Sequence, residues 1–334
     1  MRLKIIPIIL VTFLITGCDH KQEIAHLTSN ASDAIAETNY EQAVTDYSKV
    51  IRLDQQFAPA YVARASALLA MHKYDQAIED LNEGIRLEPT NYLAYQIRGD
   101  TFGRKRQFDK AIKDLTVAVS DSSDDADDLN TRGESYKLRG IIYYENRDFT
   151  NAISDFTEAA KYLPDDYYIY ELRGDCYNRK TDADKSLSNF NKAIELNPQA
   201  AGALYGRGAI YSYTGEYTNA IHDFEKAIQL RPKAVKVYNM LAWVLAICPD
   251  DKVRDGKKAV ALAAQACDMS SWTNYAFVDT LAAAYAETGD FDQAVKYQKQ
   301  AAGMNGIPGA NRTNVQNRLE LYLQHKPYHK AESF

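Results

Sequence analysis

One small residue recurs along the chain at an almost constant interval, and this repeat constrains the fold more than any other feature. The successive spacings are 34, 34, 41, 34, 34, 39 and 35 residues. A fixed period of this length indicates stacked supersecondary units, so the length of 334 residues does not give the number of domains. The recurring positions are Ala43, Ala77, Ala111, Ala152, Ser186, Ala220, Ala259 and Ala294.

Other positions keep the same phase. Glycine or alanine stands twelve residues before the recurring residue in seven of the eight units, and aromatic or leucine side chains stand three before it and four after it. Small residues let two helices cross closely, while large ones fill the gaps beside the crossing. Proline then ends the second helix. The pattern therefore predicts two antiparallel helices per unit, closed in four units by Pro89, Pro164, Pro198 and Pro232.

The stretch 24–308 resembles eight tetratricopeptide repeats, of which the first and the last two are degenerate. The resemblance implies an all-α fold, a right-handed α-solenoid of about eight helix pairs. Residues 309–334 are expected to add a C-terminal cap and tail. In the cap, 312–324 is predicted to form an amphipathic helix that covers the exposed edge of the solenoid, with Val315, Leu319 and either Tyr322 or Leu323 on its buried face.

Two insertions interrupt the period, one near 120–128 and one near 248–256. The first is rich in aspartate, but it lacks the glycine turn and the distal glutamate that a calcium-binding loop requires. A solvated acidic loop is therefore expected there, and no metal site is predicted.

The amino terminus has the features of an export signal. A basic start at Arg2 and Lys4 precedes an apolar run over residues 5–15, which is too short to span a bilayer. The following Leu14-Ile15-Thr16-Gly17-Cys18 resembles the lipobox of bacterial lipoproteins. That resemblance implies a signal peptide over 1–17, acylation of Cys18 and a lipid-anchored linker over 18–23. Asp19 resembles the signal for retention in the inner membrane, so we expect a protein anchored at the periplasmic face of the cell membrane.

Composition excludes several functions. The net charge of −6 provides no basic surface for nucleic acid. The sequence contains no phosphate-binding loop, zinc-protease helix or nucleophile elbow, so no enzyme and no cofactor are expected. Besides Cys18, three cysteines remain, an odd number that does not suit a disulfide framework. We expect Cys176, Cys248 and Cys267 to be small buried apolar residues.

A column of arginines recurs thirteen residues before the small residue, and aspartate follows sixteen residues later in four of five units. The arginines could form an anion-binding ladder. In the last two units, however, Leu241 and Leu281 replace the arginine, and the aspartate is missing from the same units. This favours an internal pair between the two helices of one repeat, as in Arg139 with Asp155, which would fix geometry more than it adds stability.

The first helix of each repeat lines the concave face in this architecture, and its outward positions are the candidate binding groove. Aromatic side chains among scattered charges suit an extended peptide or a partner helix. We expect an adaptor that binds envelope proteins or peptides, while binding of a small molecule or glycan, or service as an enzyme accessory, stays open. The candidates are Lys137, Tyr144, Tyr168, Glu171, Asp175, Arg179, Tyr205, Tyr213, Asn239 and Trp243.

Overall fold

The computed structural model describes residues 8–120 and 125–329, without the side chains of residues 8–19, 127 and 310, and every regular element in that part of the chain is an α-helix. The chain divides into two compact units, 1–164 and 165–334. No helix in the described part of the chain is long and apolar enough to cross a bilayer.

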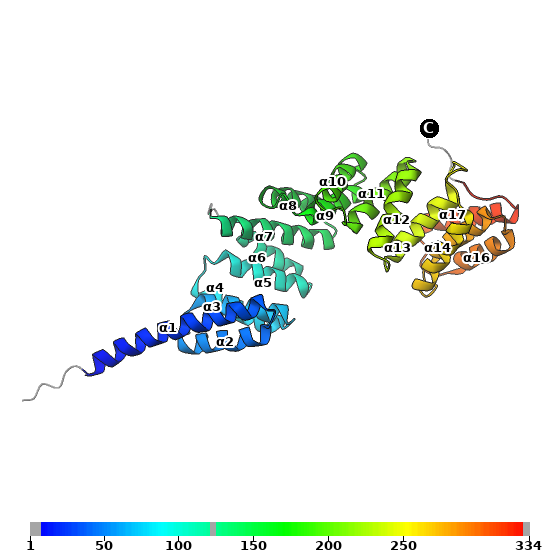
Figure 1. Cartoon of the computed structure of the whole chain (residues 1–334). Helices are drawn as coiled ribbons and strands as arrows, with labels where there is room; N and C mark the ends of the chain where they lie inside the picture. Colours follow the sequence, from blue (N-terminus) through cyan, green and yellow to red (C-terminus); the bar gives the residue numbers. More distant parts are fainter. Residues whose placement is uncertain (1–7, 121–124, 330–334) are drawn as a thin grey trace, which may run out of the picture. The chain divides into compact units, whose positions relative to one another are not determined.

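The first unit contains four helix pairs, α1–α2 to α7–α8, and the second helix of each of the first three pairs packs on the first helix of the next (Figure 1). The first helices of neighbouring pairs touch, since α3 contacts α5 and α5 contacts α7. The eight helices are α1 (Ile8–Ala36), α2 (Tyr40–Leu53), α3 (Ala58–Ala70), α4 (Tyr74–Leu87), α5 (Tyr92–Arg104), α6 (Phe108–Ala118), α7 (Ala126–Glu145) and α8 (Phe149–Tyr162).

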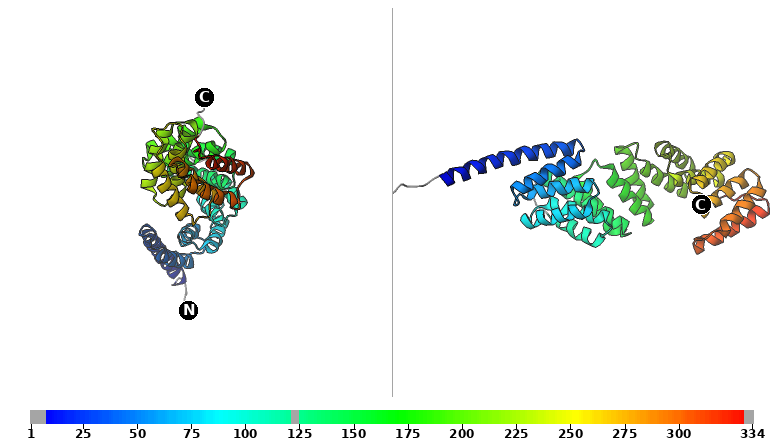
Figure 2. Two further views of the ribbon diagram at one scale, coloured as in Figure 1. Left: turned by 90° about the vertical axis from the view of Figure 1, so that its right-hand side faces the viewer. Right: turned by 90° about the horizontal axis from the view of Figure 1, so that it is seen from below.

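The second unit contains four more pairs and a single final helix, which packs on α16 and α15 (Figure 2). Eight helix pairs and a C-terminal capping helix are therefore present, and the predicted all-α repeat solenoid is confirmed. The nine helices are α9 (Tyr167–Arg179), α10 (Ala183–Leu196), α11 (Ala201–Thr214), α12 (Tyr217–Leu230), α13 (Val235–Ile247), α14 (Gly256–Met269), α15 (Tyr275–Glu287), α16 (Phe291–Gly303) and α17 (Gly309–Leu323).

The repeated small and aromatic residues form the core, as predicted. The recurring alanines are fully buried, and so is the Phe156 ring four residues after Ala152. At the crossing of α7 and α8, a Cβ atom added to Gly140 would lie 2.8 Å from the Phe156 ring. Glycine is needed there because the ring of the second helix occupies the space that any side chain would take.

The turn inside seven of the eight repeats contains one residue in the left-handed region, whereas the longer loop between α13 and α14 contains none. Glycine supplies it at Gly215 and Gly289, whereas other repeats place side-chain-bearing residues there, such as Thr181 at φ 60°. A residue with a Cβ atom is strained in this conformation. The repeats therefore carry a small local cost in exchange for a tight antiparallel turn.

Two segments outside the repeat pattern contain helix. Residues 18–23, the expected lipid-anchored linker, lie within α1, which runs unbroken from Ile8 to Ala36. The loop expected near 120–128 is shorter, because α7 already begins at Ala126 and has 20 residues against 13 in α5. Acidic residues suit the first turn of a helix, where they face its positive end. Residues 121–124 of this insertion lie outside the described part of the chain.

The insertion near 248–256 is a loop between α13 and α14, as predicted. Arg254 holds it by donating from Nη1 to the carbonyl oxygens of Cys248 and Pro249, both at 2.8 Å, and from Nε to Glu287 Oε1 at 2.8 Å. Asp255 then caps α14 by accepting from the backbone N–H of Lys258. One arginine therefore fixes the path of the loop against α15.

The final helix buries the face that its sequence predicted. Val315, Leu319 and Tyr322 are buried, whereas Leu323 is 56% exposed, so Tyr322 is the third residue of the apolar face. The three cysteines are also free and buried, as expected. Burial raises the pKa of Cys176 and of Cys267 to about 12.

Candidate binding surface

The arginine column is internal, as predicted, and is not an anion-binding ladder. In repeat four, Arg139 donates from Nε and Nη2 to the two oxygens of Asp155 at 2.7 and 2.8 Å, and both side chains are largely buried. Its remaining Nη1 donates to Thr116 on the preceding helix. Arg139 thus joins the two helices of its own repeat to the repeat before it. The same fork joins Arg64 to Asp80, Arg98 to Asp114 and Arg207 to Asp223.

The two candidates of the first unit have partners within their own repeat. Both lie on α7. The Lys137 ammonium lies 2.6 Å from Glu134 Oε2, and the Tyr144 ring packs edge-on against Phe149 with 5.9 Å between centroids. Each side chain therefore has a local structural role.

The other eight candidates lie on α9, α11 and α13. In the second unit α9 contacts α11, α11 contacts α13 and α13 contacts α15. We call the surface formed by these four helices the first-helix face. The sequence therefore assigned these residues to one continuous layer of helices, although their roles within that layer differ.

On α9, Glu171 is a structural residue and not part of a groove. Its Oε2 accepts from the backbone N–H of Ala203 at 3.0 Å and so caps α11, whose own N-cap residue Ala200 has no side-chain acceptor. Burial raises the pKa of Glu171, and the hydrogen bond from Ala203 offsets part of this effect. Asp175 and Arg179 form an ion pair at 3.5 Å one turn apart.

The exposed tyrosines of the first-helix face are Tyr168 on α9 and Tyr213 on α11, which are 41% and 79% exposed. Tyr205 behaves differently. Its ring packs against Phe224 with 6.1 Å between centroids, and burial raises the pKa of its hydroxyl. Tyr205 is therefore partly buried against the core and not an outward residue, because Phe224 on the second helix of the same repeat packs against its ring.

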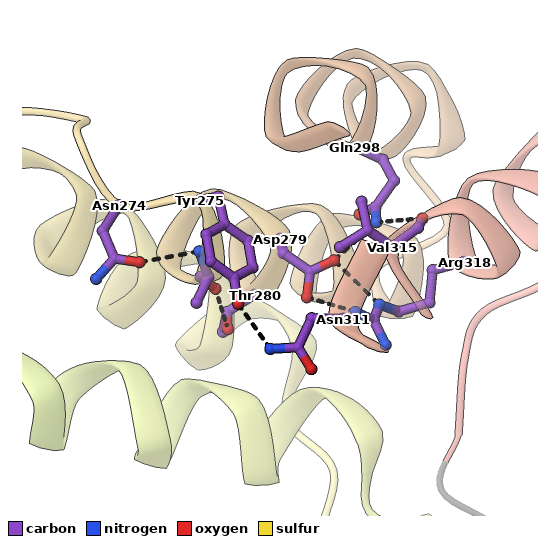
Figure 3. Close-up of polar contacts among 9 residues, drawn as sticks. Asn274, Tyr275, Asp279, Thr280, Gln298, Asn311, Val315 and Arg318 are labelled. Carbon is purple, nitrogen blue, oxygen red and sulfur yellow. Dashed lines mark hydrogen bonds and ion pairs between the residues drawn. The ribbon is translucent and has the colours of Figure 1, made fainter. Parts of the chain in front are cut away.

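On α13, Asn239 and Trp243 line a hollow of about 240 Å³ together with residues of α15 and α17. Asn239 Oδ1 is buried and accepts no hydrogen bond from the described part of the chain. Across the hollow, the amide of Asn311 donates to the hydroxyl oxygen of Tyr275 at 2.8 Å (Figure 3). The hollow therefore has an aromatic wall, and beside it lies a buried amide whose carbonyl oxygen has no hydrogen-bond partner in the described part of the chain.

A buried polar cluster forms the floor beside this hollow. Arg318 of α17 donates from Nε and Nη2 to the two oxygens of Asp279 at 3.0 and 2.8 Å (Figure 3). Gln298 of α16 donates to Asp279 Oδ1 at 2.7 Å and to the carbonyl oxygen of Val315 at 2.8 Å. The cluster ties the capping helix to the last repeat.

Sequence analysis missed the pair of Asp279 and Arg318 because neither residue lies in the arginine or aspartate column. The signal was present, since Asp279 is a single acid within an apolar run that continues through Leu281 to Ala284. An acid in such a run needs a cationic partner when it is buried.

Aromatic and cationic side chains also meet at Trp243. The guanidinium of Arg318 lies 5.3 Å from the Trp243 ring centroid and 5.5 Å from that of Tyr328, and the two rings are 6.1 Å apart. Tyr328 belongs to the segment after α17. Among the residues that the structure describes, no cluster of three or more potential ligands could hold a metal ion.

Models of the tetratricopeptide repeat match residues 62–127, 137–201, 201–234 and 279–307. A sequence search of curated proteins gave no match. Pseudomonas aeruginosa pilF is similar in structure, with a TM-score of 0.60, 13% identity and coverage of 67% of this chain and 99% of that one. A tetratricopeptide repeat protein from Parabacteroides merdae has a TM-score of 0.50, 17% identity and coverage of 80% and 99%.

A structure of the APC/C hetero-tetramer Cut9–Hcn1 has a TM-score of 0.56 and 13% identity. That match covers 89% of this chain but 55% of the other. At these identities the similarities concern the fold alone.

Proposed function

Since the chain belongs to the tetratricopeptide repeat family, whose fold is typically a non-catalytic scaffold for protein interactions, we propose that it is a membrane-anchored adaptor of the bacterial cell envelope. Its partner would be an extended segment of an envelope protein, bound on the first-helix face of the second unit.

The observation that carries this proposal is the hollow at Asn239 and Trp243. An extended segment needs acceptors for its backbone N–H groups and aromatic surfaces for its side chains. Asn239 supplies an unused acceptor, and Trp243 supplies a wall. Tyr168 and Tyr213 add exposed aromatic surface on neighbouring helices. Aromatic residues contribute most strongly to such contacts.

The anchor rests on the amino-terminal sequence. Residues 1–7 and the side chain of Cys18 lie outside what the structure describes. The support is the lipobox-like segment that ends at Cys18, together with a net negative charge that would oppose electrostatic attachment to an anionic membrane. Several acyl chains at one cysteine would hold the protein stably, whereas one chain binds reversibly.

The adaptor is tested by photo-crosslinking from position 213 in intact envelopes, followed by binding measurements with the purified crosslinked partner. Replacing Tyr168 and Tyr213 together by alanine should weaken that binding about 30-fold, because loss of interface aromatics costs about 2 kcal/mol or more. Met269→Ala is the matched control, since Met269 is similarly exposed but lies on α14, a second helix. Equal binding by both variants would contradict the adaptor surface, and crosslinks to glycan or metabolite alone would favour the small-molecule alternative.

The anchor is tested by Cys18→Ala. The variant should leave the membrane fraction while its circular dichroism in the far ultraviolet stays unchanged, because the acylated cysteine is the proposed attachment. Sedimentation with membranes after a high-salt wash would contradict lipid anchoring.

A further inference from the structure

The segment after α17 returns over the second unit and contacts it at three places. We call residues 324–329 the tail segment. The His325 ring stacks on Phe291 of α16 with 5.2 Å between centroids and an interplanar angle of 1°. Tyr328 packs on Trp243 and Arg318, and His329 Nε2 lies 2.6 Å from Glu287 Oε2 on α15.

These contacts are made by side chains. The backbone N–H of Lys326 donates to the carbonyl oxygen of Leu321. Beyond it, Pro327–His329 form no backbone–backbone hydrogen bond within the described part of the chain. The three residues are partly buried, whereas Val315 and Tyr322 of α17 are fully buried. The tail segment is thus attached as a short bound peptide would be, by a few side chains on a preformed surface, while α17 is part of the core.

The surface beneath the tail segment is formed independently of it. Nε and Nη2 on one edge of the Arg318 guanidinium both donate to Asp279, so the face of the guanidinium is held beside Trp243. Arg254 donates to the other oxygen of Glu287, which fixes that carboxylate. An aromatic wall, a cationic face and an anchored carboxylate together suit a tyrosine followed by a cationic or hydrogen-bond-donating residue.

We infer that Trp243, Arg318 and Glu287 form a docking site for a short extended segment with a tyrosine followed by a histidine or another donor, and that the tail segment occupies this site as an intramolecular competitor. The inference deepens the proposed function, since it names the kind of segment that the second unit takes and a way to regulate access. An external partner of the same chemistry has to displace Tyr328 before it packs on the part of the Trp243 ring that Tyr328 covers.

The test uses two forms of the protein, both with Trp272→Phe so that Trp243 is the sole indole. One is the full chain and the other ends at Gln324. The probe is the amidated hexapeptide of residues 324–329, titrated while Trp243 fluorescence is recorded. A tethered segment acts at an effective concentration in the millimolar range. The truncated form should bind the peptide with a Kd of about 0.1 mM or below, since the tethered segment then weakens binding to the full chain at least about tenfold.

Two controls separate docking from a structural role. A peptide with Tyr328→Ala should bind the truncated form at least about tenfold more weakly, because it lacks the ring that fills the space beside Trp243. In the full chain, Tyr328→Ala should at least about double the quenching of Trp243 by acrylamide while leaving the melting temperature nearly unchanged.

Several results would overturn the inference. A folded truncated form that does not bind the peptide, or equal binding by both forms, would show that the tail segment is not a competitor. Loss of helicity in the truncated form would show that the tail segment is part of the cap. Capture of an external partner with equal affinity by both forms would leave the adaptor proposal standing and refute competition alone.

Discussion

Repeat five contains a natural variant of the buried arginine pair, and converting it to the common form should stabilise the second unit. Arg173 donates from Nε to Asn189 Oδ1 at 2.7 Å, at the position where the four matching repeats have a carboxylate. The amide of Asn189 donates to the carbonyl oxygen of Lys185 at 2.7 Å. Burial lowers the pKa of Arg173, which indicates that the amide compensates its charge incompletely.

Asn189→Asp would replace one neutral acceptor by two charged ones. The bond that the charged Arg173 already makes contributes about 1.5–3 kcal/mol, and a second bond to the new carboxylate should add a similar amount. The change gives up the bond to Lys185 and desolvates a new carboxylate, which together remove about 1–2 kcal/mol. The net stabilisation should be about 1 kcal/mol, which corresponds to a rise in melting temperature of about 2–4 °C for a domain of this size.

Thermal melts followed by far-ultraviolet circular dichroism measure this change, and hydrogen exchange in α9 and α10 locates it. Ser188→Asp, which adds the same charge at an exposed neighbouring position of α10, should leave the melting temperature within about 1 °C. Asp155→Asn, the reverse exchange in repeat four, should destabilise the first unit. If Asn189→Asp left the melting temperature unchanged or lowered it, the desolvation cost of a buried carboxylate would equal or exceed its attraction to arginine, and the reasoning would be refuted.

Three further predictions concern the repeats. Arg139→Leu should destabilise by about 3–5 kcal/mol because it leaves Asp155 buried and unpaired, whereas adding Asp155→Leu should recover part of that loss; additive losses in denaturant titrations would contradict the pairing. Thr181→Gly should raise stability by about 0.5–1 kcal/mol, since its φ of 60° suits glycine, and a lower melting temperature would show that Thr181 is not strained. The three buried cysteines should resist iodoacetamide at pH 8 until denaturant is added, because a raised pKa leaves almost no thiolate, and rapid native labelling detected by mass spectrometry would contradict their burial.

The repeat architecture was predictable because its determinants are local. Small residues at the crossing and aromatics beside it recur within one period, so each unit specifies its own helix pair, and the pair of Arg139 and Asp155 follows from the same spacing. The start of α7 at Ala126 was not predictable from the repeat period. The longer spacing shows how many residues are inserted, but not which conformation they adopt.

The candidate site was predicted less well because the roles of its residues depend on contacts with other helices. A position in the repeat shows which face a residue occupies, but not which side chains another helix brings against it. Glu171 caps α11 because Ala200 cannot, and Tyr205 is covered by Phe224. Both contacts join residues more than eighteen positions apart, and no single column of the alignment contains them.

The hollow that we propose as part of the binding surface lies where the repeat pattern is lost, and this location has a physical reason. In the regular repeats, the arginine and aspartate columns join one repeat to the next, as Arg139 does with Asp155 and Thr116. The polar groups of these side chains are therefore hydrogen-bonded within the protein. At Leu241 and Leu281 these columns are lost, and Asp279 with Arg318 replaces them at the junction with the capping helix. In the pair of Asp279 and Arg318, one face of the guanidinium lies beside the Trp243 ring. The nearby Asn239 Oδ1 accepts no hydrogen bond in the described part of the chain. Polar and aromatic groups that could contact a ligand therefore occur where a degenerate repeat meets the capping helix, because not all of the polar groups there are used in contacts between repeats.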